Sequence, residues 1–323
     1  MRLAPASTIE PSRIRSIAVL ADEHPGTLRL FYGEDTLPTP DFIKAAAHRA
    51  IDANLTYYTP NAGYPALREA IAQTLSRLHG LERDPAGEIV VTASGMVALH
   101  LACLATLGHG TSALVVTPAW PNIPAAVRLA GAEAIEVPLR ESGERFCLDL
   151  DHLEASVRPD TRALIVTSPS NPTGWTATPD DWTRILGFCE KHDLWLIADG
   201  VYERLVAPGE VAPCPIPCER GSERTILANS FSKTYRMTGW RVGYLVAPRE
   251  VARLMTHLQE FVVSHASGIA QEAARVALLE GEEFVLEQQA RYARHRSIAV
   301  ERLRTIDGVD VPGAGQGVLG SPA

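Results

Sequence analysis

Residues 230–244 read Ser230-Phe-Ser-Lys-Thr-Tyr-Arg-Met-Thr-Gly-Trp-Arg-Val-Gly-Tyr244. Lys233 follows a β-like stretch, and a second cation, Arg241, comes eight residues later. A primary amine condenses with an aldehyde best when burial or a nearby cation lowers its pKa. The Ser230 and Ser232 hydroxyls and an arginine fork suit a phosphate dianion. Together these groups favour a site for pyridoxal phosphate, although an isolated lysine and arginine would more simply be surface charges.

The same stretch resembles the lysine signature of a known family. Ser-x-Ser-Lys followed by Met-Thr-Gly-Trp-Arg-Val-Gly-Tyr is similar to the signature of the class I/II aminotransferases, aspartate-aminotransferase-like enzymes of fold type I that depend on pyridoxal phosphate. The resemblance implies that Lys233 holds the cofactor covalently. It also implies that Ser230, Ser232 and Arg241 bind the phosphate, and that the other family motifs follow in order.

The second motif ends a buried strand. The apolar run 194–198 leads into Asp199-Gly-Val-Tyr202, which places a carboxylate at the strand's end. In the family the matching aspartate keeps the pyridine nitrogen protonated, so that the ring accepts electrons. The matching tyrosine bonds the ring hydroxyl. Gly200 stands where the family usually has glutamate, which leaves this pair intact.

The third motif is a turn after another apolar strand. Residues 163–166 precede Thr167-Ser-Pro-Ser-Asn171-Pro-Thr-Gly174, which is similar to the family's Asn-Pro-Thr-Gly loop. The resemblance implies that the Asn171 amide donates to the ring oxygen. Most Asn-Pro-x-Gly strings are ordinary turns, and here the order of the motifs makes the string specific.

Two further motifs precede these. Residues 88–99 predict a strand, a small-residue turn at Ser94-Gly95-Met96 and a helix, and a helix start of this kind suits a phosphate. The family's matching residues contact the phosphate, and Met96 would do so through its backbone amide alone. Trp120 follows the strand-ending run 115–117, where the family stacks an aromatic ring on the pyridine face; a core tryptophan is the simpler alternative.

Tyr58 and Gly33 belong to the first two motifs. The stretch from Tyr58 through Gly63 to Leu67-Arg68 resembles a family segment whose tyrosine reaches the phosphate of the neighbouring subunit, so we expect a homodimer with shared sites. Residues 33–40 read Gly-Glu-Asp-Thr-Leu-Pro-Thr-Pro where the family has Gly-Glu-Pro-x-Phe-x-Thr-Pro. The resemblance implies that the substrate is contacted by Gly33, Trp120 and Asn171.

Strands alternating with helical stretches predict an α/β fold with a mainly parallel sheet between helices. We expect an N-terminal segment (1–40) with an amphipathic helix at 12–20, joining a smaller α/β domain. A large cofactor-binding domain would span 41–250. The rest of the smaller domain would span 251–323, with helices at 251–261, 268–279 and 282–304.

Composition restricts the possible partners. The chain has 323 residues, a net charge of −8 and 46% hydrophobic residues, and it lacks a basic stripe, which argues against nucleic acid. No stretch reaches membrane-spanning length, and five scattered cysteines suit a reducing compartment, so we expect a cytoplasmic protein. Cys214 and Cys218 alone fall short of a zinc site, and we expect no metal.

The end of the chain departs from the family. After residues 308–312 the family continues with more of the smaller domain and an arginine that clamps the substrate carboxylate, whereas this chain ends with a Gly-rich stretch at 313–323. The resemblance therefore implies a member truncated at its C-terminus, whose activity is open.

The implied reaction transfers an amino group from an L-amino acid to a 2-oxo acid, with Lys233, Asp199 and Tyr202 as the catalytic residues. A lyase or decarboxylase of the same fold would share every cofactor residue, and a truncated cofactor-binding protein without activity is a third alternative. Residues 261–266 contain no arginine where dicarboxylate-specific relatives place one. This disfavours aspartate and glutamate as donors and leaves apolar or aromatic amino acids.

Overall fold

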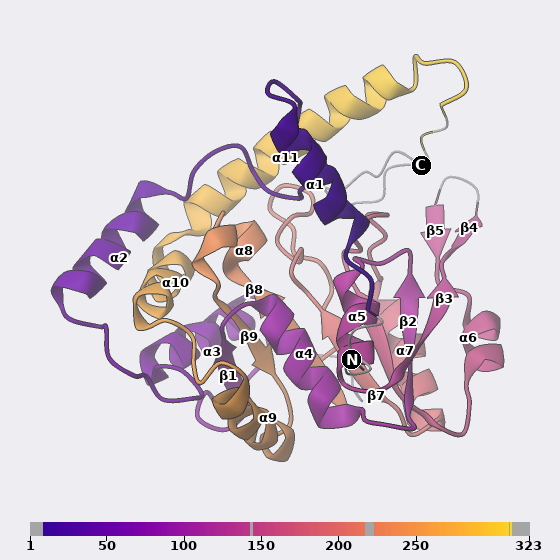
Figure 1. Ribbon diagram of the computed structural model, residues 1–323, viewed down its shortest axis with the longest axis horizontal. Helices are drawn as coiled ribbons and strands as arrows, with labels where there is room; N and C mark the ends of the chain where they lie inside the picture. The colour runs from indigo at the N-terminus through magenta and orange to yellow at the C-terminus, as the bar shows by residue number, and fades with distance from the viewer. Residues whose placement is uncertain (1–8, 143–144, 217–222, 310, 312–323) are drawn as a thin grey trace, which may run out of the picture.

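The computed structural model describes residues 9–142, 145–216, 223–309 and 311. The fold is built around a seven-stranded sheet (Figure 1). The strand order is β1-β9-β8-β7-β6-β2-β3, and a separate hairpin pairs β4 with β5. β9 runs antiparallel to its neighbours β1 and β8, whereas the other neighbouring pairs are parallel. The mainly parallel sheet is therefore confirmed. The strands are β1 (Ile89–Thr92), β2 (Ser112–Thr117), β3 (Glu133–Pro138), β4 (Arg140–Ser142), β5 (Arg145–Cys147), β6 (Thr161–Thr167), β7 (Trp195–Asp199), β8 (Thr225–Ser230) and β9 (Gly243–Val246).

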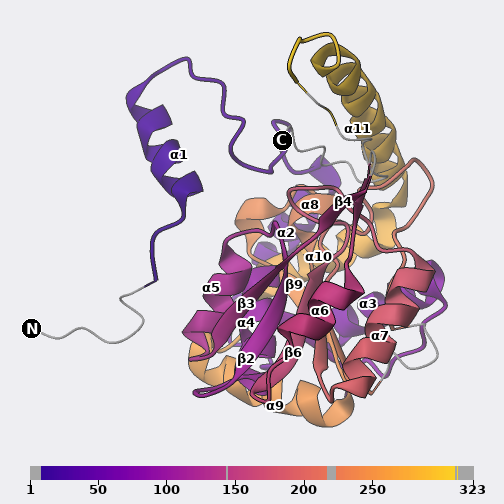
Figure 2. The same ribbon diagram turned by 90° about the vertical axis from the view of Figure 1, so that its right-hand side faces the viewer.

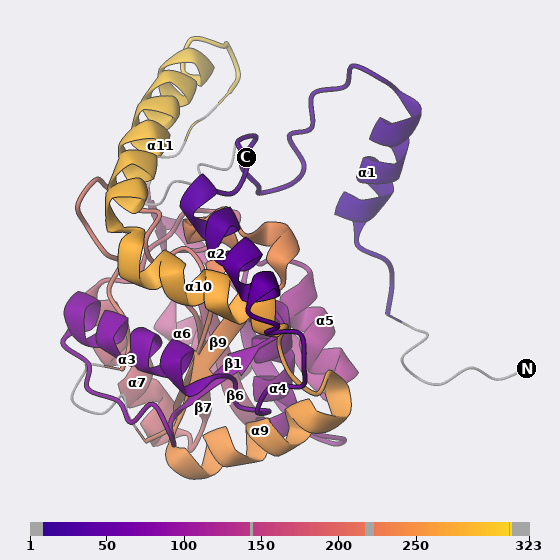
Figure 3. The ribbon, with the colours of Figure 1, turned by 90° about the vertical axis from the view of Figure 1, so that its left-hand side faces the viewer.

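Helices bury both faces of this sheet, as the continuous apolar character of its strands requires. In β2, Leu114 and Val116 join the core on one face, and Ala113 and Val115 join the core on the other. The first core includes side chains of α2 (Asp41–Asp52), α3 (Pro65–His79), α6 (Leu150–Ser156), α7 (Pro179–Lys191) and α10 (Gly268–Glu280). The second includes side chains of α4 (Gly95–Thr106), α5 (Asn122–Leu129) and α9 (Arg249–Val262). Figure 3 shows α2, α3 and α10 together on their side of the sheet.

Local sequence signals fix the ends of individual helices. At the start of α7, Thr178 accepts a hydrogen bond from the Asp181 amide at 3.1 Å, and the Asp181 carboxylate accepts one from the Thr178 amide at 2.9 Å. This capping box satisfies amides that the helix leaves without partners. The apolar residues then recur at helical spacing and are buried: Trp182, Ile185, Leu186, Phe188 and Cys189.

The predicted C-terminal helices are confirmed as α9, α10 and α11 (Glu282–Leu303). The predicted N-terminal helix is confirmed as α1 (Arg13–Glu23), which stands apart from the sheet and its helices (Figure 2). Two short elements near residue 233, α8 (Phe231–Thr234) and the 3₁₀ helix η2 (Thr238–Trp240), complete the described structure. Cys218 and the Gly-rich stretch 313–323 lie outside the described residues.

Neither a membrane span nor a metal cluster is found in the part of the chain that the structure describes. None of its helices is long and apolar enough to cross a membrane. Its histidine, cysteine and acidic side chains form no group of three or more that could hold a metal ion.

Candidate active site

Five of the predicted motifs converge because each lies at the end of a strand of one sheet, namely β1, β2, β6, β7 and β8. β6, β7 and β8 are parallel neighbours, with Thr167 beside Asp199 and Asp199 beside Ala228. The carboxyl ends of adjacent parallel strands meet at one edge, which is where ligands bind in sheets of this type. The loops that carry Asn171, Tyr202 and Lys233 all leave from this edge.

Lys233 lies on the one-turn helix α8, directly after β8. Its Nζ donates a hydrogen bond to the Gly33 carbonyl oxygen and lies 6.0 Å from the centre of the Tyr202 ring. Burial lowers the pKa of the Lys233 ammonium below its ordinary value, and the positive charge of Arg241 adds to this effect. The carboxylates of Glu34 and Asp199 act in the opposite direction. The net lowering increases the fraction of neutral amine, which is the form that attacks an aldehyde.

Asp199 is the last residue of β7 and is only 6% exposed. Its Oδ1 accepts a hydrogen bond from the Val201 amide at 3.1 Å. Burial raises the pKa of this carboxyl group to about 6, against the opposing effects of that bond and of the Lys233 charge. A buried carboxylate so placed is stabilised by a further cation or N–H donor, such as a protonated ring nitrogen.

Asn171 and Tyr202 form a polar pair beside the lysine. The Asn171 amide donates a hydrogen bond to the Tyr202 hydroxyl at 3.2 Å. Burial raises the pKa of Tyr202 far above its ordinary value, so the hydroxyl keeps its proton. A Cβ built on Gly33 would lie 3.6 Å from the Lys233 Nζ and 3.8 Å from the Tyr202 hydroxyl oxygen. Gly33 therefore brings backbone close to both groups.

The start of α4 packs closely against the end of β8 and the start of β9. A Cβ on Gly243 would lie 2.5 Å from the Gly95 amide nitrogen, and a Cβ on Gly95 would lie 2.9 Å from the Cβ of Ser230. Ser230 donates to the Ser232 hydroxyl at 2.9 Å. Glycines thus allow backbone amides and two hydroxyl groups to gather at one point.

Ser94, the residue before α4, has a φ of +127°, a conformation that side-chain-bearing residues rarely adopt. Its Oγ accepts a hydrogen bond from the Val97 amide at 3.2 Å, and its carbonyl oxygen accepts one from the Thr92 hydroxyl at 2.9 Å. Strain of this kind is concentrated at ligand sites and persists where surrounding contacts hold it. The strained backbone at Ser94 is therefore consistent with the predicted role of this turn in binding a phosphate.

Arg241, Trp120 and Met96 are the remaining residues predicted to bind the cofactor. Arg241 has a left-handed backbone with φ +53°, donates to the Thr238 carbonyl at 2.7 Å, and its pKa is lowered by burial. Trp120 and Met96 are partly buried and pack against the hydrophobic core that α4 and α5 share. The Met96 sulfur accepts a hydrogen bond from the Asn122 side-chain amide at 3.7 Å.

Tyr58 is placed away from these groups. It is 91% exposed, and its ring contacts that of His265 edge to face at 5.6 Å. Within the described part of the chain, no contact joins it to Lys233. The structure thus brings the other predicted residues to one end of the sheet and leaves Tyr58 on the outer surface.

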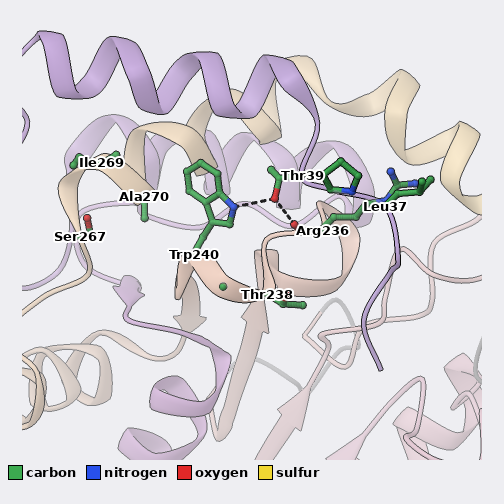
Figure 4. A pocket seen from close by; sticks show the side chains of 10 residues that line it. Leu37, Thr39, Arg236, Thr238, Trp240, Ser267, Ile269 and Ala270 are labelled. Carbon is green, nitrogen blue, oxygen red and sulfur yellow. Dashed lines mark hydrogen bonds between the residues drawn. The ribbon is translucent and has the colours of Figure 1, made fainter. Parts of the chain in front are cut away.

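A groove of about 520 Å³ opens beside η2 (Figure 4). In it the Trp240 indole donates to the Thr39 hydroxyl at 2.9 Å, and that hydroxyl donates to the Arg236 carbonyl at 2.6 Å. The groove is lined by Leu37, Pro38, Thr39, Arg236, Thr238, Gly239, Trp240, Ser267, Ile269 and Ala270. Lys233 and Asp199 are not among its walls.

The sequence did not reveal a set of side chains that support Lys233 from a distance. They are Glu34, Asp35, Arg236, Gln288 and Tyr292. Of these residues, only Asp35 could have been noticed in the sequence, because it stands where the family that the chain resembles has proline.

The residues present fit pyridoxal phosphate. The strained turn at Ser94 and the close approach of Gly95 and Gly243 form a cradle of amides and hydroxyl groups that suits a phosphate. The buried Asp199 suits the ring nitrogen, and the amine of Lys233 suits the aldehyde.

Comparisons with known proteins agree with this geometry. The family model described as aminotransferase class I and II matches residues 30–319. Aromatic-amino-acid aminotransferase 2 of Thermococcus litoralis is 37% identical over 297 residues, which cover 91% of this chain and 76% of that protein. Aspartate aminotransferase of Pyrococcus abyssi is 38% identical over 298 residues, with coverage of 91% and 76%. The solved structure of Thermus thermophilus aspartate aminotransferase with maleate matches with a TM-score of 0.90 at 32% identity, covering 98% of this chain and 84% of that one. The predicted fold type I architecture is confirmed.

Proposed function

The chain belongs to the class I and II aminotransferase family, whose members use pyridoxal 5'-phosphate, and from this premise we propose that amino-group transfer takes place at the cluster around Lys233. The observation that supports this placement is the amine of Lys233, whose pKa is lowered by burial, beside Tyr202 and near the buried Asp199. The reaction converts an L-amino acid into its 2-oxo acid and aminates a second 2-oxo acid.

The residues around Lys233 would hold the cofactor by groups matched to its parts. The phosphate would be bound by the strained turn before α4 and by the hydroxyl groups and guanidinium around α8. Trp120 would cover one face of the ring, and polar groups would contact the edge of the ring. These groups are Ser94, Gly95, Met96, Ser230, Ser232 and Arg241 for the phosphate, and Asp199, Asn171 and Tyr202 for the ring edge.

Each catalytic group then acts at a defined atom. Pyridoxal phosphate, when bound, supplies an electron sink for the pair released as the substrate Cα–H bond breaks. The Lys233 Nζ, acting as general base, accepts the Cα proton. Asp199 balances positive charge at the ring nitrogen from its buried position, and Tyr202 donates from a hydroxyl that burial keeps protonated.

The substrate would be contacted by Gly33, Trp120 and Asn171. Since the named relatives act on aromatic amino acids and on aspartate, both classes are the donors to test, together with apolar amino acids. We expect apolar or aromatic donors to be preferred, because residues 261–266 contain no arginine for a second carboxylate. Chromatography of the products decides between reactions: transfer gives one 2-oxo acid for each new amino acid, whereas decarboxylation gives an amine.

We further propose that the protein acts as a homodimer in which Tyr58 reaches the phosphate of the neighbouring site. Tyr58 is 91% exposed and has no contact with Lys233 of its own chain among the described residues. Tyr57, at 78%, and Phe261, at 86%, are also large exposed apolar side chains. Exposed apolar groups of this size favour contact with a protein partner.

Mixing two impaired variants tests this shared site. Tyr58→Phe removes a charge-assisted hydrogen bond and is expected to weaken cofactor binding about 10-fold. In a mixed dimer with Lys233→Ala, one site keeps Lys233 from one chain and Tyr58 from the other. At limiting cofactor each mixed dimer is therefore expected to transfer at about half of the rate of a wild-type dimer.

The recovery distinguishes the two arrangements. If Tyr58 served its own chain, no site of the mixed dimer would hold both groups, and mixing would give no recovery. Unmixed variants refolded separately are the control.

Two other features stay predictions of the sequence. One is the division into a segment 1–40, a large domain 41–250 and a smaller domain 251–323. The other is a cytoplasmic location, which rests on the five scattered cysteines of the sequence.

A further inference from the structure

Helix α11 holds the backbone that carries Lys233. Gln288 of α11 is 1% exposed, and its amide donates to the Thr234 carbonyl at 2.9 Å and to the Lys233 carbonyl at 3.4 Å. α8 is only one turn long, so most of its carbonyls lack partners within the helix. Gln288 supplies those partners from a distance of more than 50 residues in the chain.

The segment that covers the Lys233 amine is mostly exposed. Gly33, Glu34 and residues 36–38 are exposed, and the Gly33 carbonyl nevertheless accepts a hydrogen bond from the Lys233 Nζ. A stretch with so few buried contacts needs an anchor to keep one carbonyl in place.

Asp35 is that anchor, because its side chain is only 4% exposed within this exposed stretch. Its Oδ2 accepts a hydrogen bond from the Tyr292 hydroxyl at 2.7 Å and one from Arg291, both on α11. Its Oδ1 accepts one from the Leu37 amide at 3.0 Å. The anchor therefore joins the covering segment to the same helix that holds α8.

Arg236 joins this network from the lysine side. It lies three residues after Lys233 with a left-handed backbone, φ +51°, and its Nε lies 2.9 Å from the Asp35 Oδ2. The same Nε donates to the Gln288 side-chain oxygen at 2.9 Å. Burial acts to raise the pKa of Asp35, but these hydrogen bonds and charges outweigh it and hold that pKa below its ordinary value.

We propose that Asp35 is a positioning residue that holds Gly33 over the amine of Lys233 by anchoring residues 33–37 to α11. Asp35 touches neither the lysine amine nor a substrate, and it acts through Gly33. The inference rests on the proposed role of Lys233 as the reactive residue. It makes α11 a shared support for both sides of the amine.

The anchor has a consequence for the reactivity of the lysine. Burial is the largest cause of the lowered Lys233 pKa, and the charged groups that face the amine are Glu34, Asp199 and Arg241. Releasing residues 33–37 lets water reach the amine, which favours its charged form. The same release moves the Glu34 carboxylate away and acts in the opposite direction, but burial is the larger of the two causes. The titration midpoint of the amine then moves upward, and the neutral amine becomes more accessible to a reagent.

The test labels the cofactor-free protein with pulses of acetic anhydride over a range of pH and measures each lysine peptide by mass spectrometry. Lys44 and Lys191 are the other lysines of the chain and serve as internal references. In Asp35→Asn the Lys233 midpoint is expected to rise by roughly half to one pH unit, and the plateau labelling rate several-fold. Tyr292→Phe, which removes one hydrogen bond to Asp35, should give a smaller shift in the same direction.

A matched control removes a different carboxylate of α11. Glu282 bonds Arg204 at 2.6 Å and Arg77 at 2.9 Å and has no contact with residues 33–37 in the described structure. Glu282→Gln should lower the melting temperature and leave the Lys233 midpoint unchanged. If Asp35→Asn and Tyr292→Phe both lower the melting temperature while leaving the Lys233 midpoint and plateau at their wild-type values, Asp35 is merely structural and the proposal is wrong. Because no cofactor is present, this result would leave the proposed transfer reaction untouched.

Discussion

Replacing Lys233 with alanine is expected to abolish amino-group transfer, with a loss of roughly 10³-fold or more. In the proposed reaction the amine of Lys233 accepts the proton from the substrate Cα, and burial lowers the pKa of this amine. The phosphate cradle around Ser94 and Ser230 is unchanged in this variant, so some pyridoxal phosphate should still bind without a covalent bond. Transfer rates and the absorbance of the desalted protein measure the two effects separately.

Lys191→Ala is the matched control. Lys191 is an exposed lysine paired with Glu154 at 2.7 Å, and its removal should leave the transfer rate unchanged. A Lys233→Ala protein that still transferred amino groups near the wild-type rate would show that the reactive lysine lies elsewhere.

Asp199→Asn is expected to stabilise the cofactor-free protein and to inactivate the enzyme. Burial raises the pKa of Asp199 to about 6 in the folded state, against an ordinary value of 3.8. A carboxyl group whose pKa is raised by folding contributes stability below its unfolded pKa and loses that contribution as pH rises through the folded pKa. The asparagine carries no charge at any pH, so the variant does not lose stability in this way as the pH rises.

The gain from Asp199→Asn should therefore be small near pH 4, grow between pH 4 and pH 6, and reach about 2 to 3 kcal/mol above pH 6. Amino-group transfer should fall by roughly 10²- to 10³-fold, because the variant lacks the buried charge that is proposed to stabilise the ring nitrogen. Urea unfolding of the cofactor-free protein across this pH range measures the first effect, and transfer rates of the loaded protein measure the second.

Asp193→Asn is the control for these changes, since Asp193 is an exposed partner of Arg224. It should shift stability by less than about 0.5 kcal/mol at every pH. A stability gain from Asp199→Asn that did not depend on pH would contradict burial of a charged carboxylate as its cause.

The sequence predicted most of the fold and the residues that gather at its edge, for a physical reason. Asp199, Asn171 and Lys233 each follow an apolar strand, and the parallel strands bring their carboxyl ends together. Because these signals are local, the motifs could be located without knowing how the strands are ordered. The catalytic and binding roles of these residues stay predictions until the variants are measured.

The rest of the site depends on contacts between distant parts of the chain. Asp35 and Tyr292 are separated by 257 residues, and Gln288 contacts Thr234 across 54. Neither pair has a spacing or motif that identifies it, and the departure from the family's proline at Asp35 does not point to its partners on α11. The antiparallel orientation of β9 was also not predicted, because the sequence of a four-residue apolar strand does not indicate its direction.

The visible spectrum of the purified protein shows whether Lys233 forms part of a working amino-transfer site. The protein is incubated with pyridoxal phosphate, desalted, and mixed with aromatic, apolar and acidic L-amino acids in turn. We expect a retained cofactor band that at least one amino acid converts to the pyridoxamine form, with release of the matching 2-oxo acid. A protein that retains no cofactor, or whose band is unchanged by every amino acid, would contradict this expectation.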